Sequence, residues 1–230
     1  MILQKDPKIE NIPYVFQPIF ETGGPGADIK IGYEALMRPG HMAPAALLDS
    51  AMRQKDTHRL EFLTFYNAIA QYTERNLEGK LFINSFPYEV LTPEEFQEIF
   101  QITPDRLRGN IVVENLEYGD RISLLLVTNK VKHLRKNGFL VALDDFGMGI
   151  NSVDMLKIMQ PDIVKIDRYY VAGCTKNAAA RNTIEIVIES IRSNHSMVLA
   201  EGVETEEEYQ FLKNHADVRY MQGFYLGMPE

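Results

Sequence analysis

Short apolar runs alternate with longer segments of helical spacing along this chain. The apolar runs are rich in β-branched and aromatic residues and end in Gly, Pro or polar residues, which is typical of buried strands. Helical spacing of apolar residues predicts helices over 44–76, 121–136, 152–159 and 177–193. Two more helices should begin after Thr92 and Thr205, each followed three residues later by Glu in a capping box. We expect strands at residues 14–21, 29–38, 81–84, 110–114, 141–145, 163–167, 197–201 and 220–226.

The first two predicted strands are joined by the segment Thr22-Gly23-Gly24-Pro25-Gly26, which is a strong turn signal. A link this short favours an antiparallel hairpin, because a parallel pair needs a crossover of about a dozen residues or more. Strands and helices then alternate, which favours a (β/α)₈ barrel. A doubly wound sheet is the alternative, but no Gly-rich phosphate-binding sequence follows the first strand.

Polar residues recur where the predicted strands end. In a barrel, the carboxyl ends of the strands surround one mouth, and active sites lie there. Residues that are far apart in the sequence should therefore converge at this mouth. The set comprises Glu34, Asn84, Glu114, Asp144, Asp145, Lys165, Asp167, Glu201 and Gln222.

The strand at 141–145 carries the densest candidate chemistry, because it ends in Asp144 and Asp145. Buried neighbouring carboxylates repel each other, and a bound cation is the simplest compensation. With no Cys or His in the set, Mg²⁺ or Mn²⁺ is favoured over softer metals. Two such ions, about 3.5–4 Å apart, would activate water for phosphoryl displacement. Lys165 could stabilise developing negative charge, and Arg38 could hold a phosphate bidentately.

A plainer interpretation exists for the same residues. The two Asp side chains could cap a turn or helix in a solvated loop. Lys165 and Asp167, two apart on a strand, could form a structural ion pair. The shared position at strand ends favours the metal-site interpretation.

Composition narrows the class of protein. The 230 residues are 45% hydrophobic and 24% charged, which suits one α/β domain over residues 1–230 with its core at about 14–229. A net charge of −8 without a Lys/Arg cluster argues against binding of duplex nucleic acid. The single Cys174 excludes an internal disulfide. With no apolar leader or long apolar run, we expect a soluble cytoplasmic protein that does not contact a membrane.

The polar residues belong to longer motifs. In these motifs the chain resembles the EAL-domain family, the bacterial cyclic-di-GMP phosphodiesterases, over about residues 14–229. Three letters alone would mean little, but this combination, in this order and approximate spacing, is highly specific. The motifs are Gln17-Pro18-Ile19, Glu34-Ala35-Leu36, Asn84-Ser85-Phe86-Pro87, Glu114-x-x-Glu117, Asp144-Asp145-Phe146-Gly147-x-Gly149, Lys165-Ile166-Asp167, Ala200-Glu201-Gly202-Val203-Glu204-Thr205 and Gln222-Gly223-Phe224.

The resemblance implies a TIM-like barrel whose first strand is antiparallel, and hydrolysis of cyclic di-GMP to linear pGpG. It implies that two Mg²⁺ or Mn²⁺ ions are held by Glu34, Asn84, Glu114, Asp144 and Asp145. Lys165 would contact the attacking water, and Glu201 would be a ligand or a candidate base, so that the catalytic set is Glu34, Asp144, Lys165 and Glu201. The substrate-binding residues would be Gln17, Arg38, Asp167 and Gln222, and the supporting residues Glu117 and Glu204.

The family links the loop after Asp145 to dimerisation, so the resemblance also implies a homodimer. This loop departs from the usual family sequence at Met148, Ile150 and Asn151, while the glycines and Ser152 remain. Two rival functions stay open: a catalytically inactive EAL-fold module that binds cyclic di-GMP or a protein, and a different metal-dependent phosphohydrolase on the same barrel. Retention of every metal carboxylate and of Lys165 favours the enzyme.

Overall fold

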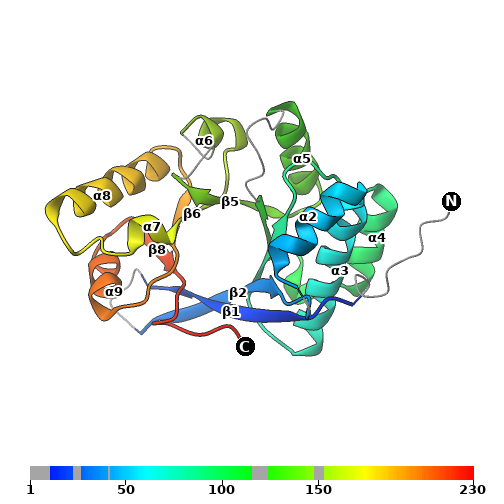
Figure 1. Ribbon diagram of the computed structural model, residues 1–230, viewed down its shortest axis with the longest axis horizontal. Coiled ribbons are helices and arrows are strands. Elements are labelled where there is room, and N and C mark those ends of the chain that lie inside the picture. Colours follow the sequence, from blue (N-terminus) through cyan, green and yellow to red (C-terminus); the bar gives the residue numbers. More distant parts are fainter. Residues whose placement is uncertain (1–10, 23–26, 41, 116–123, 148–152) are drawn as a thin grey trace.

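The strands form one closed barrel in sequence order (Figure 1). The computed structural model describes residues 11–22, 27–40, 42–115, 124–147 and 153–230. Strand β1 is antiparallel to both β2 and β8, and the other neighbouring strands pair in parallel. The predicted barrel with an antiparallel first strand is therefore confirmed. The strands are β1 (Tyr14–Glu21), β2 (Ile29–Met37), β3 (Lys80–Ser85), β4 (Ile111–Asn115), β5 (Leu140–Phe146), β6 (Ile163–Ile166), β7 (Met197–Ala200) and β8 (Val218–Met221).

Helices cover the barrel on opposite sides. In Figure 1, α2, α3 and α4 lie along one side of the ring of strands, and α8 and α9 lie along the other. The C-terminus lies beside β1, where the backbone of Glu230 pairs with that of Phe16 through hydrogen bonds of 2.9 and 3.2 Å. The helices are α2 (Pro44–Gln54), α3 (Thr57–Glu74), α4 (Pro93–Ile102), α5 (Leu124–Lys136), α6 (Val153–Met159), α7 (Arg168–Val171), α8 (Ala178–Arg192) and α9 (Glu206–Lys213), with a 3₁₀ turn, η1, at Asp105–Leu107.

The two predicted capping boxes are confirmed. The Thr92 hydroxyl accepts a hydrogen bond from the Glu95 amide, and the Glu95 carboxylate accepts one from the Thr92 amide. Thr205 and Glu208 form the same reciprocal pair at the start of α9. These contacts satisfy amides that the first turn of a helix leaves without a partner, so each helix begins where the sequence indicates.

The predicted segmentation is wrong at two places. The stretch predicted as helical over 44–76 is two helices, because Lys55 adopts a left-handed conformation (φ 57°) that ends α2. The last strand spans Val218–Met221 rather than 220–226. Its backbone bonds to β7 continue through Gln222, and the chain then turns, with the Leu226 amide bonded to the Gly223 carbonyl. Apolar spacing alone does not reveal either turn.

Two apolar layers build the core. The outer layer packs the helices against the outward-facing strand residues. The inner layer fills the barrel itself, as in other barrels of eight strands. Its buried members are Ile19, Phe82, Val112, Ala142, Ile163, Leu199 and Tyr220.

Candidate active site

The candidate site lies directly above the inner apolar layer, because side chains on a strand alternate between two faces. Each inner residue of β3 to β8 is followed two positions later by a polar residue that points to the same side. On the antiparallel β1 the order is reversed, so that Gln17 precedes Ile19. The polar residues two positions beyond the inner layer are Asn84, Glu114, Asp144, Lys165, Glu201 and Gln222.

Lys165 is the centre of this polar layer. Its ammonium lies 2.7 Å from a carboxylate oxygen of Glu114 and 2.8 Å from one of Glu201. Oxygens of Asp144 and Glu34 lie 3.3 and 3.5 Å away. Four carboxylates therefore surround one lysine, and a fifth, Asp145, follows Asp144 in the chain. A single ammonium does not neutralise that many negative charges.

Amide side chains orient Glu34 from two sides. Asn84 Nδ2 donates to one oxygen of Glu34 at 3.0 Å, and Gln222 Nε2 donates to the other at 2.8 Å. Gln222 Nε2 also lies 3.2 Å from Gln17 Oε1, and Gln17 Nε2 donates to the Gly227 carbonyl at 3.3 Å. This chain of contacts joins β8 to β1 and β2 across the closure of the barrel.

Burial sets the electrostatics of the cluster. Burial raises the pKa of Glu114 well above its ordinary value, and the neighbouring Glu34 charge adds to the rise. Burial also raises the pKa of Glu201 well above its ordinary value, against the opposing effect of Lys165. Burial alone would raise the pKa of Glu34, but Lys165, Gln222 and Asn84 together hold it below its usual range. Burial opposes protonation of Lys165, yet the surrounding carboxylates raise its pKa well above the usual value.

Glu114 is the most deeply buried carboxylate of the group. It is fully buried, and among the described residues neither of its carboxylate oxygens accepts a hydrogen bond of normal geometry, although Lys165 Nζ is near one of them. An ionised carboxylate in such a place needs a further cationic partner. This feature fits a divalent cation at the site.

Asp144, Asp145 and Glu201 could share such a cation, because each offers an oxygen within 4.8 Å of the others. Asp145 has a left-handed backbone conformation (φ 50°), which is unusual for a residue other than glycine. This conformation lets two successive Asp side chains reach the same site. The side chains of Asp144 and Glu201 are 11% and 17% exposed, against 0% for Glu114. The site therefore opens to solvent on the side of these two carboxylates.

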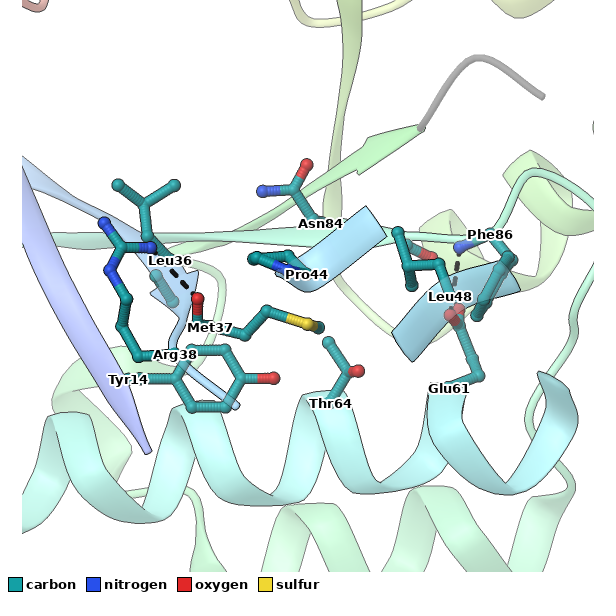
Figure 2. A pocket seen from close by; sticks show the side chains of 12 residues that line it. Tyr14, Leu36, Met37, Arg38, Pro44, Leu48, Glu61, Thr64, Asn84 and Phe86 are labelled. Atoms are coloured by element: carbon teal, nitrogen blue, oxygen red, sulfur yellow. Dashed lines mark hydrogen bonds between the residues drawn. The ribbon is translucent and has the colours of Figure 1, made fainter. Parts of the chain in front are cut away.

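A cavity of about 210 Å³ lies between the ends of β2 and β3 and helices α2 and α3 (Figure 2). Its lining is mainly apolar, with Leu36, Met37 and Leu48 among the residues. Arg38 and Asn84 also line it. Arg38 is exposed and therefore lies at the rim of this cavity, where its guanidinium donates to the main-chain oxygen of Met37 at 3.0 Å.

Two predicted site residues, Asp167 and Glu204, make their hydrogen bonds and ion pairs outside the carboxylate cluster. Asp167 does not share a strand face with Lys165, because β6 ends at Ile166 and Asp167 caps α7 by accepting from the Tyr169 amide at 2.7 Å. The exposed Glu204 pairs with Arg168. Glu117 and the unusual loop residues Met148, Ile150 and Asn151 lie outside the described residues.

Sequence reasoning missed two buried charged residues close to the site, Glu61 on α3 and Lys130 on α5. A signal for Lys130 was available. Lys130 falls at the helical spacing of Val127, Val131 and Leu134, which form the buried face of α5. A charge that interrupts an apolar stripe indicates a buried partner of opposite sign.

Comparison with known proteins agrees with this geometry. The EAL domain family matches residues 2–229 of the chain. The chain belongs to the EAL domain family. Among curated relatives, the probable cyclic di-GMP phosphodiesterase PdeD of Escherichia coli is 32% identical over 220 residues. The match covers 86% of this chain but 38% of PdeD, so the chain spans less than two fifths of that relative.

Solved EAL structures have the same barrel. A standalone EAL protein from Vibrio cholerae, in its c-di-GMP-bound form, superposes with a TM-score of 0.83 at 26% identity, covering 95% of this chain and 92% of that one. BlrP1 of Klebsiella pneumoniae, in a manganese/cy-diGMP complex, gives a TM-score of 0.79 at 23% identity, covering 100% of this chain and 57% of that one. The second likeness supports the fold alone. Within the described residues, no helix is long and apolar enough to cross a bilayer.

Proposed function

We propose that this chain hydrolyses one phosphodiester bond of cyclic di-GMP to give linear pGpG, with the help of two Mg²⁺ or Mn²⁺ ions. The observation that carries the proposal is the group of buried carboxylates around Lys165 at the mouth of an EAL barrel. Relatives named as phosphodiesterases and a related structure with bound c-di-GMP support the choice of substrate.

The ions would be held by Glu34, Asn84, Glu114, Asp144 and Asp145. When bound, such ions supply an activated water and stabilise the attacking and leaving oxygens of an in-line displacement. The excess of carboxylates over cations around Lys165 suits this role. Oxygen ligands without Cys or His favour these hard cations.

Lys165 and Glu201 would handle the proton and the charge of the reaction. Lys165 is held as an ammonium by its carboxylate neighbours, so it can donate a hydrogen bond to the attacking water or to a phosphate oxygen. Glu201 lies 2.8 Å from it and is partly exposed at the mouth. Its carboxylate could orient or deprotonate the water, because burial raises its pKa well above its ordinary value and so makes it a stronger base.

The substrate would be held at the rim of the carboxylate cluster. Arg38 offers a guanidinium fork beside the cavity, which suits a phosphate. Gln17 and Gln222 lie next to Glu34 and could bond the sugar or phosphate edge. Asp167 and Glu204 would act indirectly, through the α7 cap and the Arg168 pair. Glu117 would brace the loop after Asp145, and a homodimer would form through that region.

The main alternative is an EAL-fold receptor that binds cyclic di-GMP without turnover, and a phosphohydrolase for another diester is the second. To separate them, the purified chain is incubated with cyclic di-GMP and Mg²⁺ or Mn²⁺, and nucleotides are resolved by chromatography. Metal-dependent pGpG that disappears with EDTA and in Glu34→Ala supports the enzyme. Saturable binding without product favours the receptor, and absence of both contradicts the choice of ligand.

A further inference from the structure

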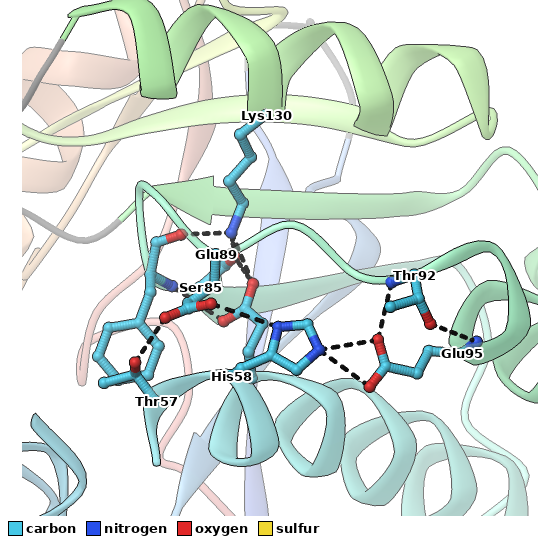
Figure 3. A network of polar contacts seen from close by, with 9 residues as sticks. Thr57, His58, Ser85, Glu89, Thr92, Glu95 and Lys130 are labelled. Carbon is cyan, nitrogen blue, oxygen red and sulfur yellow. Dashed lines mark hydrogen bonds and ion pairs between the residues drawn. The ribbon is translucent and has the colours of Figure 1, made fainter. Parts of the chain in front are cut away.

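A buried ion pair lies directly behind the end of β3, on the outer side of the barrel wall. Lys130 Nζ of α5 lies 2.6 Å from Glu61 Oε1 of α3, and the two side chains are 2% and 1% exposed. Figure 3 shows Lys130 reaching from its helix toward the segment that contains Ser85. Neither residue belongs to the carboxylate cluster around Lys165.

The pair binds the Ser85 hydroxyl and both main-chain polar groups of Phe86. Glu61 accepts the Ser85 hydroxyl at 2.5 Å and the Phe86 amide at 3.0 Å. Lys130 donates to the Ser85 hydroxyl at 2.5 Å and to the main-chain oxygen of Phe86. Because Ser85 and Phe86 directly follow Asn84, the pair fixes the chain at the point where the strand leaves the sheet.

Stability alone does not account for this arrangement. Burial lowers the pKa of Lys130 even though the Glu61 charge opposes the change, so the pair does not fully offset desolvation of the ammonium. Apolar side chains of similar volume often stabilise a protein core as much as a buried ion pair does, or more. Unlike apolar side chains, a charged pair makes directional hydrogen bonds, and these define the position of the backbone that it contacts.

The position of that backbone matters for the carboxylate cluster. Asn84 Nδ2 donates to Glu34 at 3.0 Å, and Asn84 stands level with Glu114 in the β3–β4 register. A shift of the chain at the end of β3 would move the Asn84 amide away from Glu34. Ligand geometry of this kind depends on residues that contact the ligands rather than the ion.

We propose that Lys130 and Glu61 are positioning residues that hold Asn84 in place for divalent-cation binding and for turnover. The proposal rests on the function proposed above. The pair acts through the Ser85 hydroxyl and the Phe86 backbone, and neither of its residues is among the proposed substrate-binding residues. Its loss should therefore lower kcat and cation affinity while leaving KM for cyclic di-GMP unchanged.

The test compares Lys130→Met with the control Lys132→Met, which removes an exposed lysine from the same helix. Mn²⁺ binding is measured by calorimetry without nucleotide, kcat and KM are measured with cyclic di-GMP, and thermal unfolding shows that each variant is folded at the assay temperature. For Lys130→Met we expect a loss of about 10- to 100-fold in Mn²⁺ affinity and in kcat, the range seen when residues that orient metal ligands are removed. The control should match the wild type.

A folded Lys130→Met protein with wild-type Mn²⁺ affinity and kcat would overturn the proposal. If Lys130→Met does not fold, Ser85→Ala decides, because it removes the hydroxyl that both side chains hold; wild-type values in that variant would also overturn the proposal. If the wild type binds Mn²⁺ but makes no pGpG, the proposed catalysis fails. The role of the Lys130–Glu61 pair is then tested by the Mn²⁺ affinity of Lys130→Met alone. If the wild type binds no Mn²⁺, both proposals fail.

Discussion

Tyr170 donates a hydrogen bond from its hydroxyl to the main-chain oxygen of Gly147 at 2.8 Å. The contact ties α7 to the backbone two residues after Asp145. Gly147 has φ +96°, and a Cβ there would lie 2.6 Å from the Tyr170 ring, so the ring and the glycine fit against each other closely. Tyr170 thereby fixes the exit of β5 next to two of the proposed cation ligands.

Tyr170→Phe should remove the hydrogen bond between α7 and the end of β5 while keeping the aromatic ring in place. Loss of this solvent-exposed hydrogen bond is expected to lower the free energy of unfolding by only about 0.5 kcal/mol, the lower end for one hydrogen bond. Because Asp145 would be held less firmly, we also expect kcat to fall about tenfold. This is the lower end of the loss seen when residues that orient metal ligands are removed. Urea unfolding and steady-state kinetics measure the two effects. Tyr169→Phe is the control, since Tyr169 is 71% exposed; equal kcat in both variants would contradict the role of Tyr170.

Asp144→Asn should almost abolish turnover. The substitution preserves shape but removes a negative charge from the group that could hold a cation with Asp145 and Glu201. We expect kcat to fall by at least about 100-fold, the scale seen when one group that stabilises developing charge is lost. The rate of pGpG formation at saturating Mn²⁺ measures it. An undiminished rate in this variant would rule out a mechanism that depends on the metal.

Arg38→Ala should weaken substrate binding and leave the fold unchanged, because the side chain is exposed and its guanidinium donates to the main-chain oxygen of its own neighbour, Met37. Hydrogen bonds to charged groups contribute about 1.5–3 kcal/mol, so KM should rise about tenfold or more with a smaller change in kcat. Arg38→Lys is the matched variant, since it keeps the charge but not the bidentate fork, and it should recover part of the loss. An unchanged KM in Arg38→Ala would exclude Arg38 from the substrate site.

Glu208→Gln tests a structural carboxylate away from the site. The Glu208 carboxylate accepts hydrogen bonds from the amides of Gly173, Glu204 and Thr205 at 3.0–3.2 Å. Burial would raise the pKa of Glu208, but these amides outweigh burial and hold it below its ordinary value. A carboxyl with a depressed folded-state pKa stabilises the protein above its unfolded pKa of about 4.3, and this contribution is lost as pH falls through the folded value.

We therefore expect Glu208→Gln to lower the free energy of unfolding by about 1–2 kcal/mol at pH 7, because charged acceptors make stronger bonds than neutral ones. The difference from wild type should shrink as pH falls below about 4. Urea unfolding between pH 7 and pH 3 measures it, and the exposed Glu207→Gln serves as the control. A difference that stays constant with pH would contradict the carboxylate's role.

Local signals decided much of what could be predicted. Each barrel strand was visible as an apolar run, and the caps at Thr92 and Thr205 were visible as side-chain patterns that act within one turn. Gly residues marked the hairpin after β1. The breaks at Lys55 and after Gln222 escaped prediction, because their backbone turns depend on packing around them rather than on a local apolar pattern.

By itself, the sequence determined the strands, their order and the polar residues at their ends, since strand periodicity and end chemistry are properties of neighbouring residues. It did not determine that Lys165 lies within 3.5 Å of Glu34, Glu114, Asp144 and Glu201. Nor did it pair Lys130 with Glu61, 69 positions away. Only the closed barrel decided these contacts, because distances between side chains on different elements are set by strand register and by the packing of helices on the sheet.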